Sequence, residues 1–151
     1  MPPKSFKFRL QSILDYKKKR EDEEKEKLAK LMQALSAEEK VLLNLQHLLA
    51  REKEEYREKQ RAGTLNLEEL KMYHAYIKKV ENDIVLQTQK IQKLNAEVEN
   101  QRQQLLKATQ EKKVFEKLKD KHHGDFLQEI EEEERKMIDE LATVRYKKEG
   151  N

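Results

Sequence analysis

The 151-residue chain contains no cysteine and no tryptophan, only two prolines and three glycines, and 6% aromatic residues. Without cysteine it has no disulfide framework, no thiolate metal site and no cysteine nucleophile. With 36% hydrophobic residues, an ordinary globular core and a compact catalytic domain are not expected. Because helix-breaking residues are scarce, the composition favours either long helices or a charged disordered segment.

Long apolar runs are also missing. The N-terminus has no apolar run of signal-peptide length, and no stretch reaches the roughly 18 consecutive apolar residues of a membrane span, so we expect neither secretion by that route nor a transmembrane chain. The 33 Lys and Arg residues nearly balance the 30 Asp and Glu residues. A net charge of +3 does not by itself indicate a nucleic acid or a membrane surface as partner. Because the absence of cysteine is compatible with a reducing compartment and no secretion signal is expected, the cytoplasm is the expected compartment.

Apolar residues recur every seven residues in both halves of the chain. A disordered chain of mixed charge would not keep this phase over about five heptads in two separate stretches. We therefore predict an all-α fold, a long antiparallel coiled-coil hairpin of two helices. The two sets are Leu28, Leu35, Leu42, Leu49 and Tyr56 in the first half, and Leu70, Ile77, Ile84, Ile91, Val98 and Leu105 in the second.

A short turn separates the two halves. Gly63 can adopt the left-handed conformation that ends a helix, and Asn66 can cap the next helix, with Glu69 three residues later as in a capping box. Such a short connection makes the two helices antiparallel neighbours. The expected organisation is a single coiled-coil hairpin over residues 1–151, with helices at about 5–62 and about 67–147 and a turn at about 63–66.

The position of the turn predicts which residues face each other, because seam partners should have numbers that add to about 129. This register places Tyr56 opposite Tyr73 and Leu14 opposite Phe115. Polar side chains interrupt the seam of the first helix at three positions, and there we expect looser packing. These positions are Lys17, Glu21 and Glu24, opposite Lys112, Ala108 and Leu105.

The same register leaves the second helix about 20 residues longer than the first, an overhang at the C-terminal end. Apolar residues on this segment recur at spacings of mostly three and four, which indicates a helix face that contacts a protein. Two alternatives are packing on the end that holds Phe6, Phe8 and Leu10, and self-association of two copies. The apolar stripe consists of Phe126, Ile130, Met137, Leu141 and Val144.

Residue patterns for catalysis or ligand binding are weak. Of the four histidines, only His123 shares a helix face with a nearby acid, Asp120, so we predict no metal site. The three glycines are isolated and form no phosphate loop, and no serine lies near a histidine and an acid. Basic residues are interspersed with acids rather than clustered with aromatics. We therefore expect no enzymatic activity, no cofactor, no small-molecule substrate and no nucleic-acid partner.

Three segments together resemble one protein family. They are the opening stretch Phe6–Asp15, the stretch Glu111–Leu118 and the ending Asp139–Arg145, combined with two helices of unequal length. The chain in these respects resembles the bacterial flagellar export protein family FliJ over nearly its full length. The resemblance implies a non-enzymatic stalk or adaptor of the flagellar type III export apparatus, similar in shape to the coiled-coil stalk of the rotary ATP synthase.

The resemblance also implies partners and a location. The terminal end would bind the hexameric export ATPase and promote its assembly and turnover, and other surface would contact the export gate protein FlhA and the export chaperones. The protein would be cytoplasmic and peripherally associated with the cell membrane at the flagellar base. The residues implied are Phe126, Met137, Leu141 and Arg145 for the ATPase, and Tyr56, Tyr73, Tyr76 and Val80 for the gate.

The heptads place Tyr76 just outside the seam, so we expect its side chain to be partly exposed. A general coiled-coil adaptor, or an antiparallel dimer in an unrelated pathway, is the alternative function. A monomer is expected from the stalk interpretation, which distinguishes it from the dimer.

Overall fold

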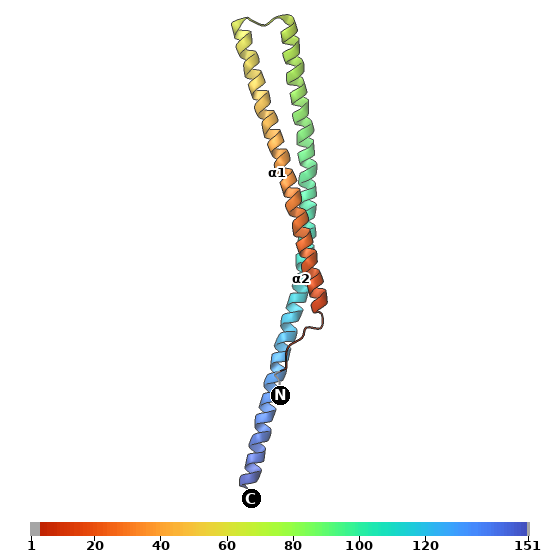
Figure 1. Ribbon diagram of the computed structural model, residues 1–151, viewed down its shortest axis with the longest axis vertical. Coiled ribbons are helices and arrows are strands. Elements are labelled where there is room, and N and C mark those ends of the chain that lie inside the picture. The colour runs from red at the N-terminus through yellow and green to blue at the C-terminus, as the bar shows by residue number, and fades with distance from the viewer. Residues whose placement is uncertain (1–3, 151) are drawn as a thin grey trace. The chain divides into compact units, whose positions relative to one another are not determined.

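The computed structural model describes residues 4–150, and within this range it contains two helices and no strand. Helix α1 spans Gln11–Ala62 and helix α2 spans Leu67–Glu149, joined by a short turn (Figure 1). This confirms the all-α antiparallel hairpin predicted from the heptads. Its contacts divide the chain into two compact units: a turn unit, Glu23–Leu105, and a terminal unit, Met1–Asp22 with Leu106–Asn151.

The first helix begins later than expected, at Gln11 rather than near residue 5. In the preceding segment, Phe6 stacks edge-on against His123, with ring centroids 4.9 Å apart, and Phe8 against His122, at 5.7 Å. Side chains two residues apart lie on the same side of an extended backbone but on nearly opposite sides of a helix. An extended segment therefore lets both phenylalanines pack on α2, which a helix would not.

The turn has the capping structure that the sequence predicts. Gly63 has a positive φ of 67°, and the amide of Thr64 donates to the carbonyl of Lys59 at 3.3 Å, the pattern of a Schellman motif. On the other side, the side-chain oxygen of Asn66 accepts a hydrogen bond of 2.8 Å from the amide of Glu69. Backbone groups at both helix ends thus have hydrogen-bond partners within a few residues, so that the turn in the chain is stabilised by local contacts.

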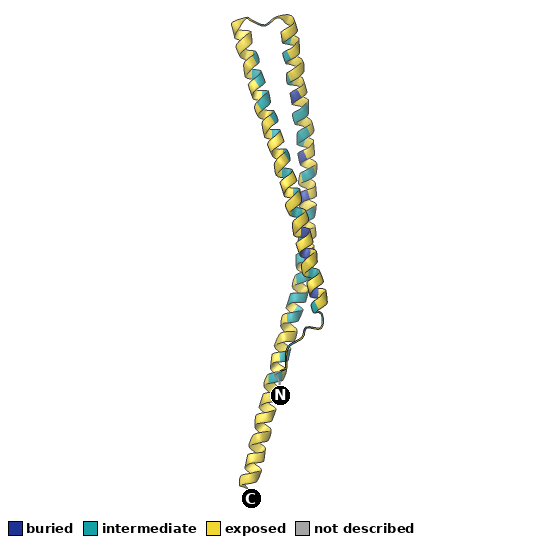
Figure 2. Cartoon of the chain, in the orientation of Figure 1, coloured by how far each residue is buried: buried dark blue, intermediate teal, exposed yellow. Residues whose placement is uncertain are grey.

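In the turn unit, the helices meet along the predicted seam. Val80, Ile91 and Val98 of α2 are buried, and half-buried side chains follow the facing side of α1 (Figure 2). Near the turn, the rings of Tyr56 and Tyr73 are 5.8 Å apart, as the register predicts. The seam is therefore apolar over most of its length, and only a few of its side chains are fully buried.

Two polar contacts repeat along this seam at an interval of two heptads. Gln101 donates to the backbone oxygen and the carboxylate of Glu24, and Gln87 does the same to Glu38. Glu24 is buried, although looser packing was expected at this position. That expectation was wrong because it ignored diagonal partners: the glutamine reaches across the seam from one helical turn away.

The terminal unit has its own polar seam. Glu21 is only 4% exposed, and its carboxylate lies 3.0 Å from the ammonium of Lys112, while Lys17 pairs with Glu111 at 3.1 Å. The hydrogen bond that Lys112 donates to the carboxylate of Glu21 is the main cause of a raised pKa at Lys112. Leu14 is fully buried beside these ion pairs. Here too the expected loosening does not occur, since charged groups of opposite sign compensate each other.

We predict that Gln101→Ala destabilises the protein by about 1.5 kcal/mol, because the buried carboxylate of Glu24 loses its amide donor. Gln103→Ala is the control, since Gln103 bonds only the neighbouring exposed Glu99. Urea unfolding followed by circular dichroism measures both. Equal midpoints for the two variants would contradict the assigned role of the repeated polar contacts.

We also predict that acid weakens the hairpin through Glu38. The pKa of this carboxyl is lowered, chiefly by the hydrogen bond from Gln87 and then by Lys90, whose ammonium lies 3.0 Å away. A lowered pKa in the folded state stabilises the fold above the unfolded pKa, and this stabilisation is lost as the pH falls through the folded value. The melting temperature should therefore fall between about pH 5 and about pH 3, less steeply in Glu38→Gln. Parallel declines in both proteins would exclude Glu38 as a cause.

Candidate functional site

The C-terminal part of α2, residues 134–149, is exposed on all sides within the terminal unit (Figure 2). Met137 and Leu141 are 65% and 62% exposed, and Arg145 follows at the same four-residue spacing. These three residues therefore lie on one face of the helix. Other side chains of this segment line a shallow surface next to that face, namely Ile138, Ala142, Val144, Tyr146, Lys148 and Glu149.

One exposed apolar residue of this surface was not among the predicted stripe residues. Ile138 is 66% exposed and lies three residues before Leu141, next to the face of the predicted stripe, which includes Met137 at this level instead. With Ile138, the apolar surface extends around more of the helix than the stripe alone. A search for any apolar residue on this segment, rather than for one periodic face, would have found it.

Phe126, at the start of the predicted stripe, is already covered. Its ring lies 5.6 Å from that of Phe6, and a salt bridge of 3.1 Å joins Lys4 to Glu133 further along α2. The described part of the N-terminal segment therefore packs on the beginning of the stripe. Packing on the N-terminal end therefore applies to the start of the stripe, where Phe6 leaves Phe126 half-buried. Contact of the stripe with another protein stays a prediction.

The residues expected to face the export gate are assembled near the turn. Tyr76 is 40% exposed, as predicted, and Tyr56 and Tyr73 are half-buried next to it. The ammonium of Lys59 lies over the ring of Tyr73, 5.1 Å from the ring centroid. Val80, however, is only 3% exposed. Its seam position turns the side chain inward, so Val80 is the least accessible of the four residues, and its contact with a partner stays a prediction.

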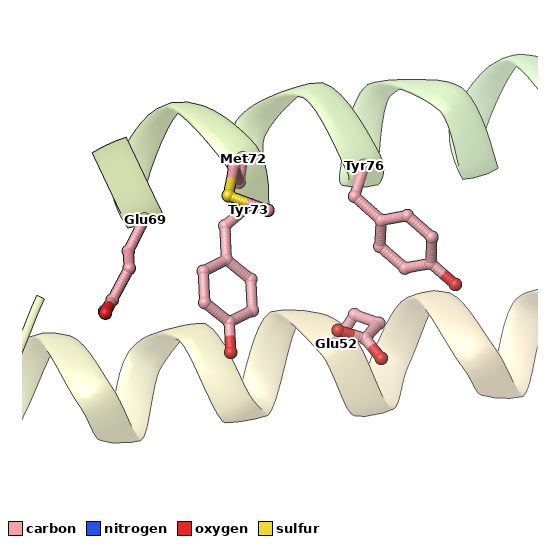
Figure 3. Close-up of a pocket in the computed structure, with 5 residues that line it drawn as sticks. All are labelled: Glu52, Glu69, Met72, Tyr73 and Tyr76. Atoms are coloured by element: carbon pink, nitrogen blue, oxygen red, sulfur yellow. The ribbon is translucent and has the colours of Figure 1, made fainter. Parts of the chain in front are cut away.

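A groove of about 330 Å³ lies beside these tyrosines in the turn unit. Glu69, Tyr73 and Tyr76 extend from α2 toward α1, and Glu52 lies on α1 between the levels of the two tyrosines (Figure 3). Met72 completes the lining. We call this the tip groove.

Glu52, Glu69 and Met72 of the tip groove were not among the predicted site residues. A signal was available on α2, where Glu69, Met72 and Tyr76 are three and four residues apart and share one face. Glu52 falls at a heptad position of the seam, seven residues after Leu45, so its contribution to the groove depends on the pairing of the two helices.

Within residues 4–150, no group of three or more His, Asp or Glu side chains is arranged to hold a metal ion. The adjacent His122 and His123 pack against Phe8 and Phe6 instead. Neither α1 nor α2 includes a stretch long and apolar enough to cross a membrane.

Comparison with known proteins agrees with the fold. Residues 6–151 match the family described as flagellar FliJ protein. The flagellar FliJ protein of Bacillus subtilis (strain 168) is 25% identical over 150 residues, which cover 97% of this chain and 99% of that protein. No solved structure matches. The chain therefore belongs to the flagellar FliJ protein family, a non-catalytic family with a role related to flagellar export.

Proposed function

We propose that this protein is a non-enzymatic adaptor of the flagellar type III export apparatus. Its terminal unit binds the hexameric export ATPase and promotes the assembly and turnover of that enzyme. Its turn unit contacts the export gate protein FlhA, and further surface binds export chaperones. The observation that carries the proposal is the exposed apolar face of α2 after residue 133, in a chain of the FliJ family.

The ATPase contact is argued from the character of this face. Met137 and Leu141 present apolar side chains at a spacing of four, with Arg145 one turn further. An amphipathic helix of this kind binds by laying its apolar face into a hydrophobic groove of a partner. Methionine and arginine are both enriched in the cores of protein interfaces. The exposed segment thus has the composition of a helix that inserts into another protein.

The gate contact is argued from the aromatic layer near the turn. Tyr76 offers an accessible ring with a polar tip, and Tyr56 and Tyr73 hold the surface behind it rigid. Binding to a gate protein in the membrane would keep the adaptor at the cytoplasmic face of the cell membrane, at the flagellar base. This peripheral location requires no membrane-spanning helix in the adaptor itself.

Size-exclusion chromatography with light scattering tests the proposal. The chain alone should elute as a monomer and should co-elute with the export ATPase of the same organism. A chain ending at Glu133 should remain folded and lose the co-elution, because it lacks the exposed face. A stable dimer that ignores the ATPase would contradict the proposal and favour self-association through the apolar stripe.

A further inference from the structure

We propose that the tip groove recognises a basic amphipathic segment of a protein partner. An aromatic or aliphatic side chain of that segment would lie on Met72 and Tyr76, while a neighbouring lysine or arginine would contact Glu52 and Glu69. The inference rests on the gate contact of the proposed function, for which it supplies the chemistry of the partner. It uses two charged residues and a methionine that the family resemblance did not indicate.

The geometry of the groove suits two kinds of contact at once. Tyr73 and Tyr76 form part of its apolar wall, and the carboxylates of Glu52 and Glu69 come from different helices (Figure 3). Since the carboxylates flank Tyr73 from the two helices, a ligand that fills the groove meets apolar surface and negative charge together. An entirely apolar ligand would leave the carboxylates without a partner of opposite charge.

The negative charge of the groove is not paired in a salt bridge within residues 4–150. Within residues 4–150, neither Glu52 nor Glu69 forms a salt bridge, whereas Glu81 nearby pairs with Lys53 at 3.5 Å. No basic side chain lines the groove. Lys59 lies over the ring of Tyr73, 5.1 Å from its centroid, and its pKa is raised chiefly by Tyr73 and to a smaller extent by the charges of Glu55 and Glu69. A lysine or arginine of a partner could therefore form a salt bridge with Glu52 or Glu69 without displacing a salt bridge of this protein.

The apolar part of the groove is accessible. Met72 is 71% exposed and Tyr76 is 40% exposed. Methionine adapts its shape to different partners, and tyrosine is among the residues that dominate binding energy at interfaces. An arginine could also stack on the tyrosine ring while it contacts a carboxylate. These two side chains would provide the apolar share of the binding energy.

Charge complementarity selects the occupant. Two carboxylates with no basic neighbour in the lining disfavour anionic lipids, nucleic acids and acidic peptides, because like charges that face each other oppose binding. A basic segment is attracted from a distance and gains charge-assisted hydrogen bonds on contact. The groove is therefore better suited to a basic protein segment than to a membrane surface.

Two synthetic helical peptides test this inference. They share a central Phe-Leu pair and differ only in whether lysines or glutamates flank it. Fluorescence anisotropy with the full chain should show binding of the lysine peptide, weakened by salt, and no binding of the glutamate peptide. Glu52→Gln combined with Glu69→Gln should weaken binding of the lysine peptide about tenfold, the sum of two exposed charge contacts.

The matched control is Glu58→Gln combined with Glu68→Gln. It removes the same charge near the turn, from exposed residues outside the groove. Circular dichroism verifies that both double variants remain helical. Equal weakening by the two double variants, or equal binding of the two peptides, would overturn the inference, since attraction would then be non-specific.

The cytoplasmic part of FlhA, used as a second probe, separates this inference from the proposed function. If the chain binds FlhA equally well with and without Glu52→Gln and Glu69→Gln, the gate contact stands and the inference is wrong. If the lysine peptide binds through the groove but FlhA does not bind, the inference stands and the gate contact fails.

Discussion

Replacing both Met137 and Leu141 by aspartate is expected to abolish stimulation of the export ATPase while the circular dichroism spectrum stays unchanged. Both side chains are mostly exposed within the terminal unit, so the substitutions remove no packing inside it. In a complex they would place two charges in an apolar contact. Loss of two interface anchors at about 2 kcal/mol each corresponds to a loss of affinity of about a thousandfold.

The control for this variant is the substitution of Val114 and Leu127 by aspartate. Both lie on α2 in the terminal unit, are exposed to a similar degree and fall outside the apolar stripe. This variant should stimulate the ATPase like the wild-type chain. Retained stimulation by the variant at Met137 and Leu141 would exclude that face as the ATPase contact.

Leu14→Ala is expected to lower the free energy of unfolding by about 3 kcal/mol. Leu14 is 1% exposed, and truncation of a fully buried leucine costs both its transfer free energy and that of the cavity left behind. Ile13→Ala, at an exposed neighbour in the same helical turn, should cost less than about 1 kcal/mol. Urea unfolding measures the difference. Similar losses for both would show that Leu14 does not anchor the terminal unit.

The hairpin and its turn could be predicted because their signals are local. A seven-residue apolar period needs only a helix to form a seam, and Gly63 and Asn66 cap their helices through contacts within a few residues. The pairing of Tyr56 with Tyr73 then followed from the position of the turn. These features required no knowledge of side-chain packing elsewhere.

The start of α1 and the polar seam could not be predicted in this way. Phe6 and Phe8 keep the N-terminal segment extended because they pack on residues more than a hundred positions later. Glu21 is compensated by Lys112 and Glu24 by Gln101, each from the other helix. Such compensation depends on exact cross-helix geometry, which heptad positions alone do not specify.

The candidate surfaces could be predicted only in part, because their extent also depends on contacts between distant segments. The exposed positions of Met137, Leu141 and Tyr76 could be predicted from helical spacing and heptad position. The accessibility of Phe126 depends on the packing of the N-terminal segment, and that of Val80 depends on the packing of α1 against α2. Helical spacing therefore predicts which residues of each surface are exposed, and tertiary contacts determine how far each surface extends.

The most direct test of the central claim is the rate of ATP hydrolysis by the export ATPase of the same organism, with and without the full chain. An adaptor that promotes assembly and turnover of the hexamer should raise the rate in a saturable manner. The variant with aspartate at Met137 and Leu141 should have no effect at the same concentration. An unchanged rate with the wild-type chain, at concentrations that keep it folded, would contradict the proposed function.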